Sequence, residues 1–233
     1  MLRWFRFSVA LLSLVALGCV TSDDNATADD NATADDNATA NDNATANEEG
    51  WVSLFDGESL NGWKKAMENE ESWQVKDGDL VCKGPRCHLF YVGEEAPWKN
   101  FHFKAEVMTL PGSNSGIYFH TRYQETGWPT VGHESQVNNS HTDPVRTGSL
   151  YAVELNKVAP ATDNQWFTQE VIVQGKHVLV KVDGRTIIDY TEPADQQPGD
   201  SFERVLNEGT FAFQAHDPDS EVHFRNVEVK RLP

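Results

Sequence analysis

Alternation of apolar and polar residues after position 50 constrains the fold of this chain more than any other feature. Successive side chains of a β-strand point to opposite faces, so a period of two indicates a strand with one buried face. Ile117 and Phe119 share one face of such a segment, and Tyr118, His120 and Arg122 share the other. The pattern predicts a sheet with one face in the core and one face that carries polar side chains.

Two further segments repeat this arrangement. Glu134, Gln136 and Asn138 fall on one face of a second predicted strand, and Gln214 and His216 fall on one face of a third. Imidazole, carboxylate and amide groups therefore recur on strands that are far apart in the sequence. We expect these rows to meet in one polar, ligand-binding groove.

Turn signals separate many short strands. Gln174-Gly175-Lys176 divides residues 170–182 into a predicted hairpin, and Asp183-Gly184 predicts the next turn. No amphipathic helix of any length is apparent. Ten or more short strands predict an all-β fold, a two-sheet β-sandwich with one curved sheet that presents a concave surface.

The N-terminal 50 residues predict export and tethering. Arg3 and Arg6 precede a short apolar stretch that ends at Gly18-Cys19, so residues 1–18 are typical of a signal peptide and Cys19 of a lipidated N-terminus. Residues 19–50 hold a six-residue acidic repeat that is typical of a flexible linker. We expect a protein of the periplasm or cell surface, anchored to the outer membrane only through lipid, with residues 51–233 as one domain.

The charge and the cysteines limit other possibilities. The formal net charge is −17, and the domain remains acidic without the linker, which argues against nucleic acid as a partner. Cys82 and Cys87 flank a short turn, and an exported protein can form disulfides, so the sequence predicts a disulfide between them. The oligomeric state is left open.

The polar residues favour one chemistry over another. Conventional glycoside hydrolysis usually needs two carboxyl groups about 5 to 10 Å apart, but Glu134 is the single carboxylate of its row. A distant acid such as Glu154 would have to supply the second. Proton abstraction next to a sugar ketone needs only one base, with donors or a divalent metal to stabilise the enolate. His120, Arg122 and His216 add the residue types for that reaction.

Several phrases also resemble a known family, the 3-keto-disaccharide hydrolases, long filed as a domain of unknown function. The similar segments are Leu54 to Trp63, Asn114-Ser115-Gly116-Ile117, Gly132-His133-Glu134-Ser135-Gln136, Thr147-Gly148-Ser149-Leu150-Tyr151, Gln214-Ala215-His216 and Phe224-Arg225-Asn226-Val227. The resemblance implies a concanavalin A-like jelly roll that cleaves 3-keto-glycosides, which a partner sugar 3-dehydrogenase would supply. Carried over by position, it implies functional roles for Glu134, Gln136 and His216.

We therefore assign candidate roles to the polar face. His216 or His120 would be the base, and Glu134 a metal ligand or partner carboxylate. The expected substrate-binding residues are Arg122, Gln136, Tyr151, Gln214 and Trp128, whose indole could stack on a sugar ring. A divalent metal, either calcium or a transition metal, could be held by Glu134 and His216. The main alternative is a non-catalytic carbohydrate-binding module that uses the same face.

Overall fold

A computed structural model describes residues 50–233 of the chain. The predicted signal peptide, the lipidation site Cys19 and the linker up to residue 49 lie outside the described residues. Within residues 50–233 the chain forms thirteen strands and one 3₁₀ helix, η1 (Glu70–Ser72), and it contains no helix long and apolar enough to span a bilayer.

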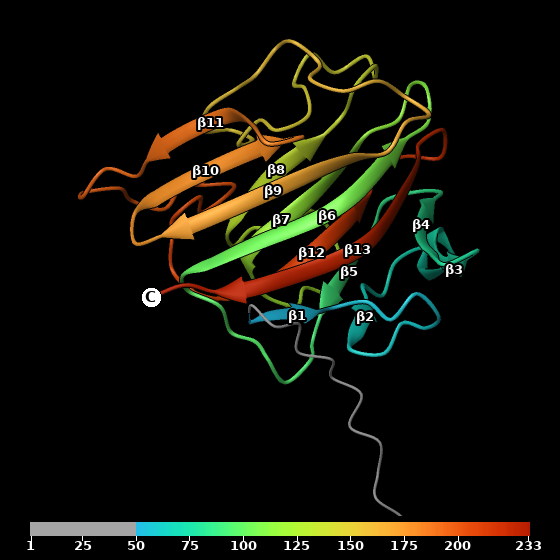
Figure 1. The fold of residues 1–233 in the computed structure, drawn as a ribbon, viewed down its shortest axis with the longest axis horizontal. Coiled ribbons are helices and arrows are strands. Elements are labelled where there is room, and N and C mark those ends of the chain that lie inside the picture. The colour runs from blue at the N-terminus through green and yellow to red at the C-terminus, as the bar shows by residue number, and fades with distance from the viewer. Residues whose placement is uncertain (1–49) are drawn as a thin grey trace, which may run out of the picture. The chain divides into compact units, whose positions relative to one another are not determined.

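The strands form two stacked sheets (Figure 1). The eight-stranded sheet has the order β11-β10-β9-β6-β13-β4-β3, and β1 pairs with β13. Its strands are β1 (Trp51–Ser53), β3 (Trp73–Lys76), β4 (Asp79–Lys83), β6 (Phe101–Thr109), β9 (Phe167–Gln174), β10 (His177–Val182), β11 (Arg185–Thr191) and β13 (Glu221–Arg231).

The five-stranded sheet carries the polar rows and has the order β2-β5-β12-β7-β8. Its strands are β2 (Trp63–Lys65), β5 (Cys87–Tyr91), β7 (Ser115–Thr121), β8 (His133–Val137) and β12 (Thr210–Ala215). The predicted two-sheet, all-β sandwich is confirmed.

The hydrophobic core lies between the sheets. Phe213 of β12 stacks on Phe224 of β13 with ring centroids 4.3 Å apart, and on Trp63 of β2 at 5.2 Å. Ile117 and Phe119 of β7 are also fully buried. These are the apolar positions of the alternating pattern, so the polar positions between them point away from the opposing sheet.

The predicted hairpins are also confirmed. β9 and β10 pair in antiparallel register from His177 opposite Gln174 to Val182 opposite Gln169. The following turn at Asp183-Gly184 returns the chain into β11, with Val182 opposite Arg185. Both turns contain a glycine with positive φ, Gly175 and Gly184, which is the conformation that favours glycine in tight turns.

The predicted disulfide is wrong. Cys82 lies on β4 of the large sheet and Cys87 on β5 of the small one, and both are free and buried. The turn between them carries the chain from one sheet to the other, which separates the two thiols. Burial raises the pKa of each thiol to about 12.

Candidate functional site

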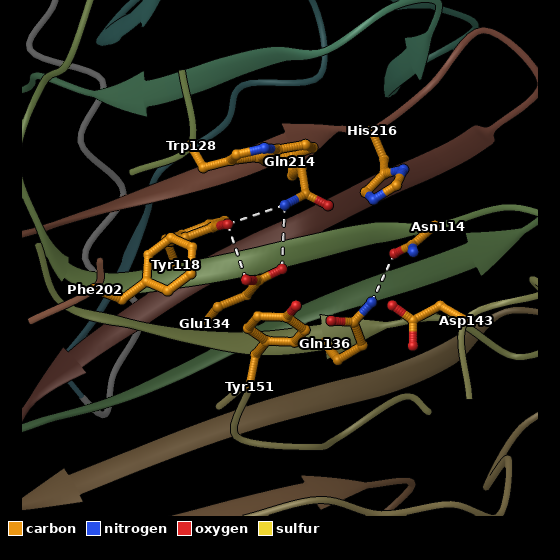
Figure 2. A pocket seen from close by; sticks show the side chains of 10 residues that line it. All are labelled: Asn114, Tyr118, Trp128, Glu134, Gln136, Asp143, Tyr151, Phe202, Gln214 and His216. Carbon is orange, nitrogen blue, oxygen red and sulfur yellow. Dashed lines mark hydrogen bonds between the residues drawn. The ribbon is translucent and has the colours of Figure 1, made fainter. Parts of the chain in front are cut away.

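Three neighbouring strands of the small sheet build the floor of a pocket. Tyr118 on β7 lies opposite Glu134 on β8, and its hydroxyl donates to Glu134 Oε2 at 2.9 Å. Gln214 on β12 donates from Nε2 to Tyr118 Oη at 2.9 Å and to Glu134 Oε1 at 3.1 Å (Figure 2). The result is a closed triangle of three buried side chains, each held by the other two.

Gly116 provides the room that Glu134 occupies. A Cβ atom at this position would lie 2.4 Å from Glu134 Oε1 and 3.0 Å from its Cγ. Gly116 stands inside β7, without a positive φ, so close approach and not turn geometry explains the glycine.

Glu134 is only 4% exposed, and its burial raises the pKa of the carboxyl group. Arg204 opposes this shift, because its Nη2 lies 3.6 Å from Glu134 Oε2. Arg204 is itself buried in the irregular segment before β12, where Nη1 donates to the Gly132 carbonyl at 2.9 Å. The carboxyl group of Glu134 and the guanidinium of Arg204 therefore lie beneath the pocket, largely screened from solvent.

The rest of the pocket comes from loops. The cavity measures about 190 Å³ and is lined by Asn114, Tyr118, Trp128, Glu134, Gln136, Asp143, Tyr151, Phe202, Gln214 and His216. Trp128 forms one wall, with its ring 5.2 Å from that of His216 and 5.6 Å from that of His88. Arg86 also stacks on Trp128, with its guanidinium 5.0 Å from the ring centroid.

His216 forms a hydrogen-bonded pair with its sequence neighbour. Its Nδ1 lies 2.8 Å from Asp217 Oδ2, which also accepts from Ser220 Oγ at 2.7 Å, while the Asp219 N–H donates to Oδ1 at 3.0 Å. Partial burial would raise the pKa of Asp217, but these hydrogen bonds lower it overall. Because the ionised Asp217 carboxylate can only accept, a neutral His216 must donate to it from a protonated Nδ1. The other ring nitrogen, Nε2, is then the one that can take up a proton.

Six of the predicted site residues line this one pocket: Trp128, Glu134, Gln136, Tyr151, Gln214 and His216. His120 and Arg122 do not line it. The backbone of His120 has a φ of 53°, and the β7–β12 register shifts between Thr210 and Ala212. This irregularity breaks the period of two, so the prediction that both residues share the face of Tyr118 is wrong.

Other contacts hold these two side chains. His120 is 2% exposed and uses both ring nitrogens, one toward the Lys99 carbonyl at 2.9 Å and one toward the Asn207 N–H at 3.2 Å. The Arg122 side chain is 75% exposed and lies 4.0 Å from Glu203. Neither side chain therefore reaches the pocket, so neither is placed to act on a ligand there.

Sequence reasoning gave no site role to six contributors, of which Asn114 and Tyr118 line the pocket from β7 and the residue before it. Asp217 directly follows His216, so the pair could have been recognised. Asp143 and Phe202 come from loops, and Arg204 from an irregular segment, none of which carries a periodic pattern. Glu154, the acid considered as a second carboxyl group, is exposed and does not line the pocket, whereas Asp143 does.

One group of side chains could hold a metal ion. Within the described residues, ligand atoms of His141, His216 and Asp217 lie within 4.8 Å of one another. Two imidazoles and a carboxylate suit a transition metal, whereas calcium prefers oxygen ligands throughout. Glu134 is not a member of this group, so it is not brought together with His216 as the predicted ligand pair.

The hydrogen bonds of His141 oppose metal binding in the observed arrangement. Its Nδ1 accepts the Asp143 N–H at 3.1 Å, so the proton of the neutral ring belongs on Nε2, the nitrogen that lies 3.7 Å from Asp217. Coordination through Nε2 would require the ring to change tautomer and lose that bond. The geometry therefore fits a hydrogen-bonded cluster better than a preformed metal centre.

Comparisons with known proteins agree with this architecture. The family model described as the 3-keto-alpha-glucoside-1,2-lyase-like domain matches residues 50–230. No curated protein matches the chain.

One similar solved structure comes from Parabacteroides distasonis ATCC 8503 and is named for an inferred glycosyl hydrolase activity. It is 22% identical to this chain with a TM-score of 0.66, and the match covers 79% of this chain and 94% of that one. A second such structure from the same organism is 20% identical with a TM-score of 0.61, covering 78% and 99%. The carbohydrate-binding module CBM66 of Bacillus subtilis is 13% identical with a TM-score of 0.52, covering 72% and 95%. At these sequence identities, the three structures show a shared fold and nothing more.

Proposed function

Because the chain belongs to the family of 3-keto-alpha-glucoside-1,2-lyase-like domains, we propose that its pocket cleaves glycosides whose sugar is oxidised at C3. The observation that carries the proposal is the convergence of the His216–Asp217 pair and the buried Glu134 cluster on one cavity. The first provides a base, and the second provides a carboxyl group that Tyr118 and Gln214 hold in place by hydrogen bonds. An oxidoreductase would supply the ketone.

The reaction begins with proton transfer to His216. A carbonyl at C3 acidifies the C2 proton, and His216 Nε2 takes it while Asp217 stabilises the imidazolium that forms. The electron pair of the C2–H bond forms the enolate. The C1–O bond then breaks, which leaves a C1–C2 double bond and releases the leaving group with a proton. His216 then gives the abstracted proton to solvent, water adds its oxygen to C1 and its lost proton restores Glu134, and C2 takes a proton from solvent, so the net result is hydrolysis.

The buried cluster serves the charges that develop in this sequence. The pKa of Tyr118 is raised by burial and by the neighbouring Glu134, so its phenol remains a hydrogen-bond donor. We assign Glu134 to the proton that the leaving group needs, because burial raises the pKa of this carboxyl group and so favours its protonated form. Gln214 and Gln136 contact sugar hydroxyls, and Trp128 stacks on the ring.

Two observations support alternatives. Asp143 lines the same pocket as Glu134, which supplies the pair of carboxyl groups that conventional hydrolysis requires. An aromatic wall beside buried amides also suits a binding module without catalysis. Neither alternative makes use of the oriented His216–Asp217 pair.

Incubation of the purified domain with a 3-keto-disaccharide and with its unoxidised parent separates the three functions. We expect release of the 3-keto sugar from the oxidised substrate alone, and loss of about 10² to 10⁴ in rate for His216→Gln. His177→Gln is the matched control, because that histidine pairs with Asp189 at the surface and does not line the pocket.

The other outcomes are equally clear. Cleavage of the unoxidised parent supports the two-carboxylate mechanism, and binding of both sugars without cleavage of either supports the binding module. A parallel incubation with a chelator reports whether a metal ion contributes to turnover.

A further inference from the structure

Asp143 presents a carboxylate to the pocket from a tightly hydrogen-bonded loop. The Arg146 Nη1 donates to three acceptors around it, Asn138 Oδ1, the His141 carbonyl and the Asp143 carbonyl, at 2.6 to 3.0 Å. Asn138 Nδ2 also donates to the Asp143 carbonyl at 3.0 Å. This network fixes the backbone of Asp143, so the position of its side chain does not depend on a bound ligand.

One carboxylate oxygen of Asp143 remains for a ligand. Oδ1 accepts the Val145 N–H at 2.8 Å, and the backbone N–H of Asp143 donates to His141. Figure 2 shows the carboxylate beside Gln136, whose Nε2 donates to Asn114 Oδ1 at 2.6 Å. Gln136 Oε1 and Gln214 Oε1 are buried without a hydrogen-bond partner among the described residues. The pocket is thus rich in acceptors.

No lysine or arginine is among the residues that line the pocket in the described part of the chain. The buried cation, Arg204, lies 3.6 Å from Glu134 and donates from Nη1 to a backbone carbonyl, while its Nε and Nη2 have no hydrogen-bond partner among the described residues. Sugar hydroxyls can donate to the acceptors that remain, whereas a carboxylate or phosphate cannot. An anionic group would also face the carboxylate of Asp143, and no lysine or arginine among the lining residues would offset that repulsion.

From this arrangement we propose that Asp143 is a specificity-determining residue, which binds hydroxyl groups of a neutral pyranose and rejects sugars that carry a carboxylate or phosphate. This inference rests on the proposed function insofar as the pocket takes a sugar. It does not depend on oxidation at C3 or on bond cleavage.

Binding can be measured with unoxidised sugars, by following the fluorescence of Trp128 in the full domain. The probes are the methyl glycosides of glucose and of glucuronic acid, which differ in one CH₂OH group replaced by a carboxylate. We expect the glucuronide to bind roughly tenfold to a hundredfold more weakly than the glucoside. Trp128→Phe identifies the part of the signal that comes from the pocket.

Asp143→Asn keeps the shape of the side chain and its hydrogen bond from Val145 but removes the charge. We expect this variant to bind the glucoside more weakly and to lose most of its discrimination against the glucuronide. Glu154→Gln, an equivalent change outside the pocket, should leave both affinities unchanged.

Equal binding of the two glycosides by the wild-type domain, unchanged selectivity in Asp143→Asn, or binding of neither sugar would overturn the inference. The 3-keto forms of the same two glycosides separate it from the proposed function. Turnover of both 3-keto forms at equal rates refutes the role of Asp143 but leaves the reaction standing. Selective binding of the glucoside without turnover of either 3-keto form supports the role of Asp143 and refutes the proposed reaction.

Discussion

At the scale of single residues, the site depends on the mutual support of Tyr118, Glu134 and Gln214. Each oxygen of the Glu134 carboxyl group accepts a hydrogen bond, and the neighbouring position 116, where a Cβ atom would clash with it, is a glycine. Burial raises the pKa of this carboxyl group while Arg204 lowers it. Two predictions follow from these opposing and supporting contacts.

Gly116→Ala should displace the Glu134 side chain, because the new Cβ would lie 2.4 Å from Oε1. We expect a destabilisation of about 1–3 kcal/mol. Urea unfolding of Gly116→Ala, Glu134→Ala and the double variant measures the coupling. Since the clash needs both side chains, the double variant should be more stable than the sum of the single effects predicts. Additive effects would show that Gly116 does not hold space for Glu134.

Arg204→Gln should raise the pKa of Glu134 further, because it removes the cation that favours the ionised form. The carboxyl stretching bands of Glu134, identified by comparison with Glu134→Gln in infrared difference spectra, report this titration. Arg122→Gln is the control, since that guanidinium lies at the surface beside Glu203. An unchanged titration in Arg204→Gln would contradict the electrostatic account of the pair.

At the scale of strands, the period of two determined what could be predicted. It placed Glu134 and Gln136 of β8 and Gln214 of β12 correctly, because these strands are regular where the residues lie. It failed at His120, whose left-handed backbone turns the imidazole out of the row. A single sequence gives no sign of such an irregularity, since it arises from pairing between β7 and β12, about 90 residues apart.

The strands also explain why the predicted disulfide between Cys82 and Cys87 is wrong, because β4 and β5 belong to different sheets. The structure predicts two free, protected thiols instead. Cys82 and Cys87 should both be unreactive toward a thiol reagent in the folded domain, because both are buried and their thiolates are disfavoured. Two thiols should react after unfolding in denaturant without a reductant. Recovery of one disulfide-linked peptide under those conditions would contradict the separation of β4 and β5.

At the scale of the whole domain, buried histidines couple stability to pH. Burial lowers the pKa of His88 and His133 to about 3 and that of His120 to about 4. In the unfolded chain these groups titrate near 6.5, so the unfolded state binds protons first as the pH falls. The folded domain therefore has its full stability, as far as these histidines are concerned, above pH 6.5. It loses that stability progressively as the pH falls toward their folded-state pKa values of about 3 to 4.

Urea unfolding at pH 7.5, 6.0 and 5.0 should therefore show a steady loss of stability, with each histidine contributing at most about 1.4 kcal/mol per pH unit. Carboxyl groups with lowered pKa values, such as Asp217 and Glu68, act in a lower range of pH. His88→Phe should reduce the slope, because neither nitrogen of His88 has a hydrogen-bond partner in the described structure. A slope that His88→Phe leaves unchanged would argue against this origin.

The chemistry of the whole pocket can be tested through the fate of one hydrogen atom. If His216 removes the C2 proton and water later adds across the double bond, a 3-keto-disaccharide cleaved in D₂O must carry deuterium at C2 of the released 3-keto sugar. Mass spectrometry at early times, corrected for exchange of the product without enzyme, measures this directly. We predict one deuterium at C2 per turnover; release of a 3-keto sugar that retains its original hydrogen at C2 would contradict elimination and favour direct displacement at C1.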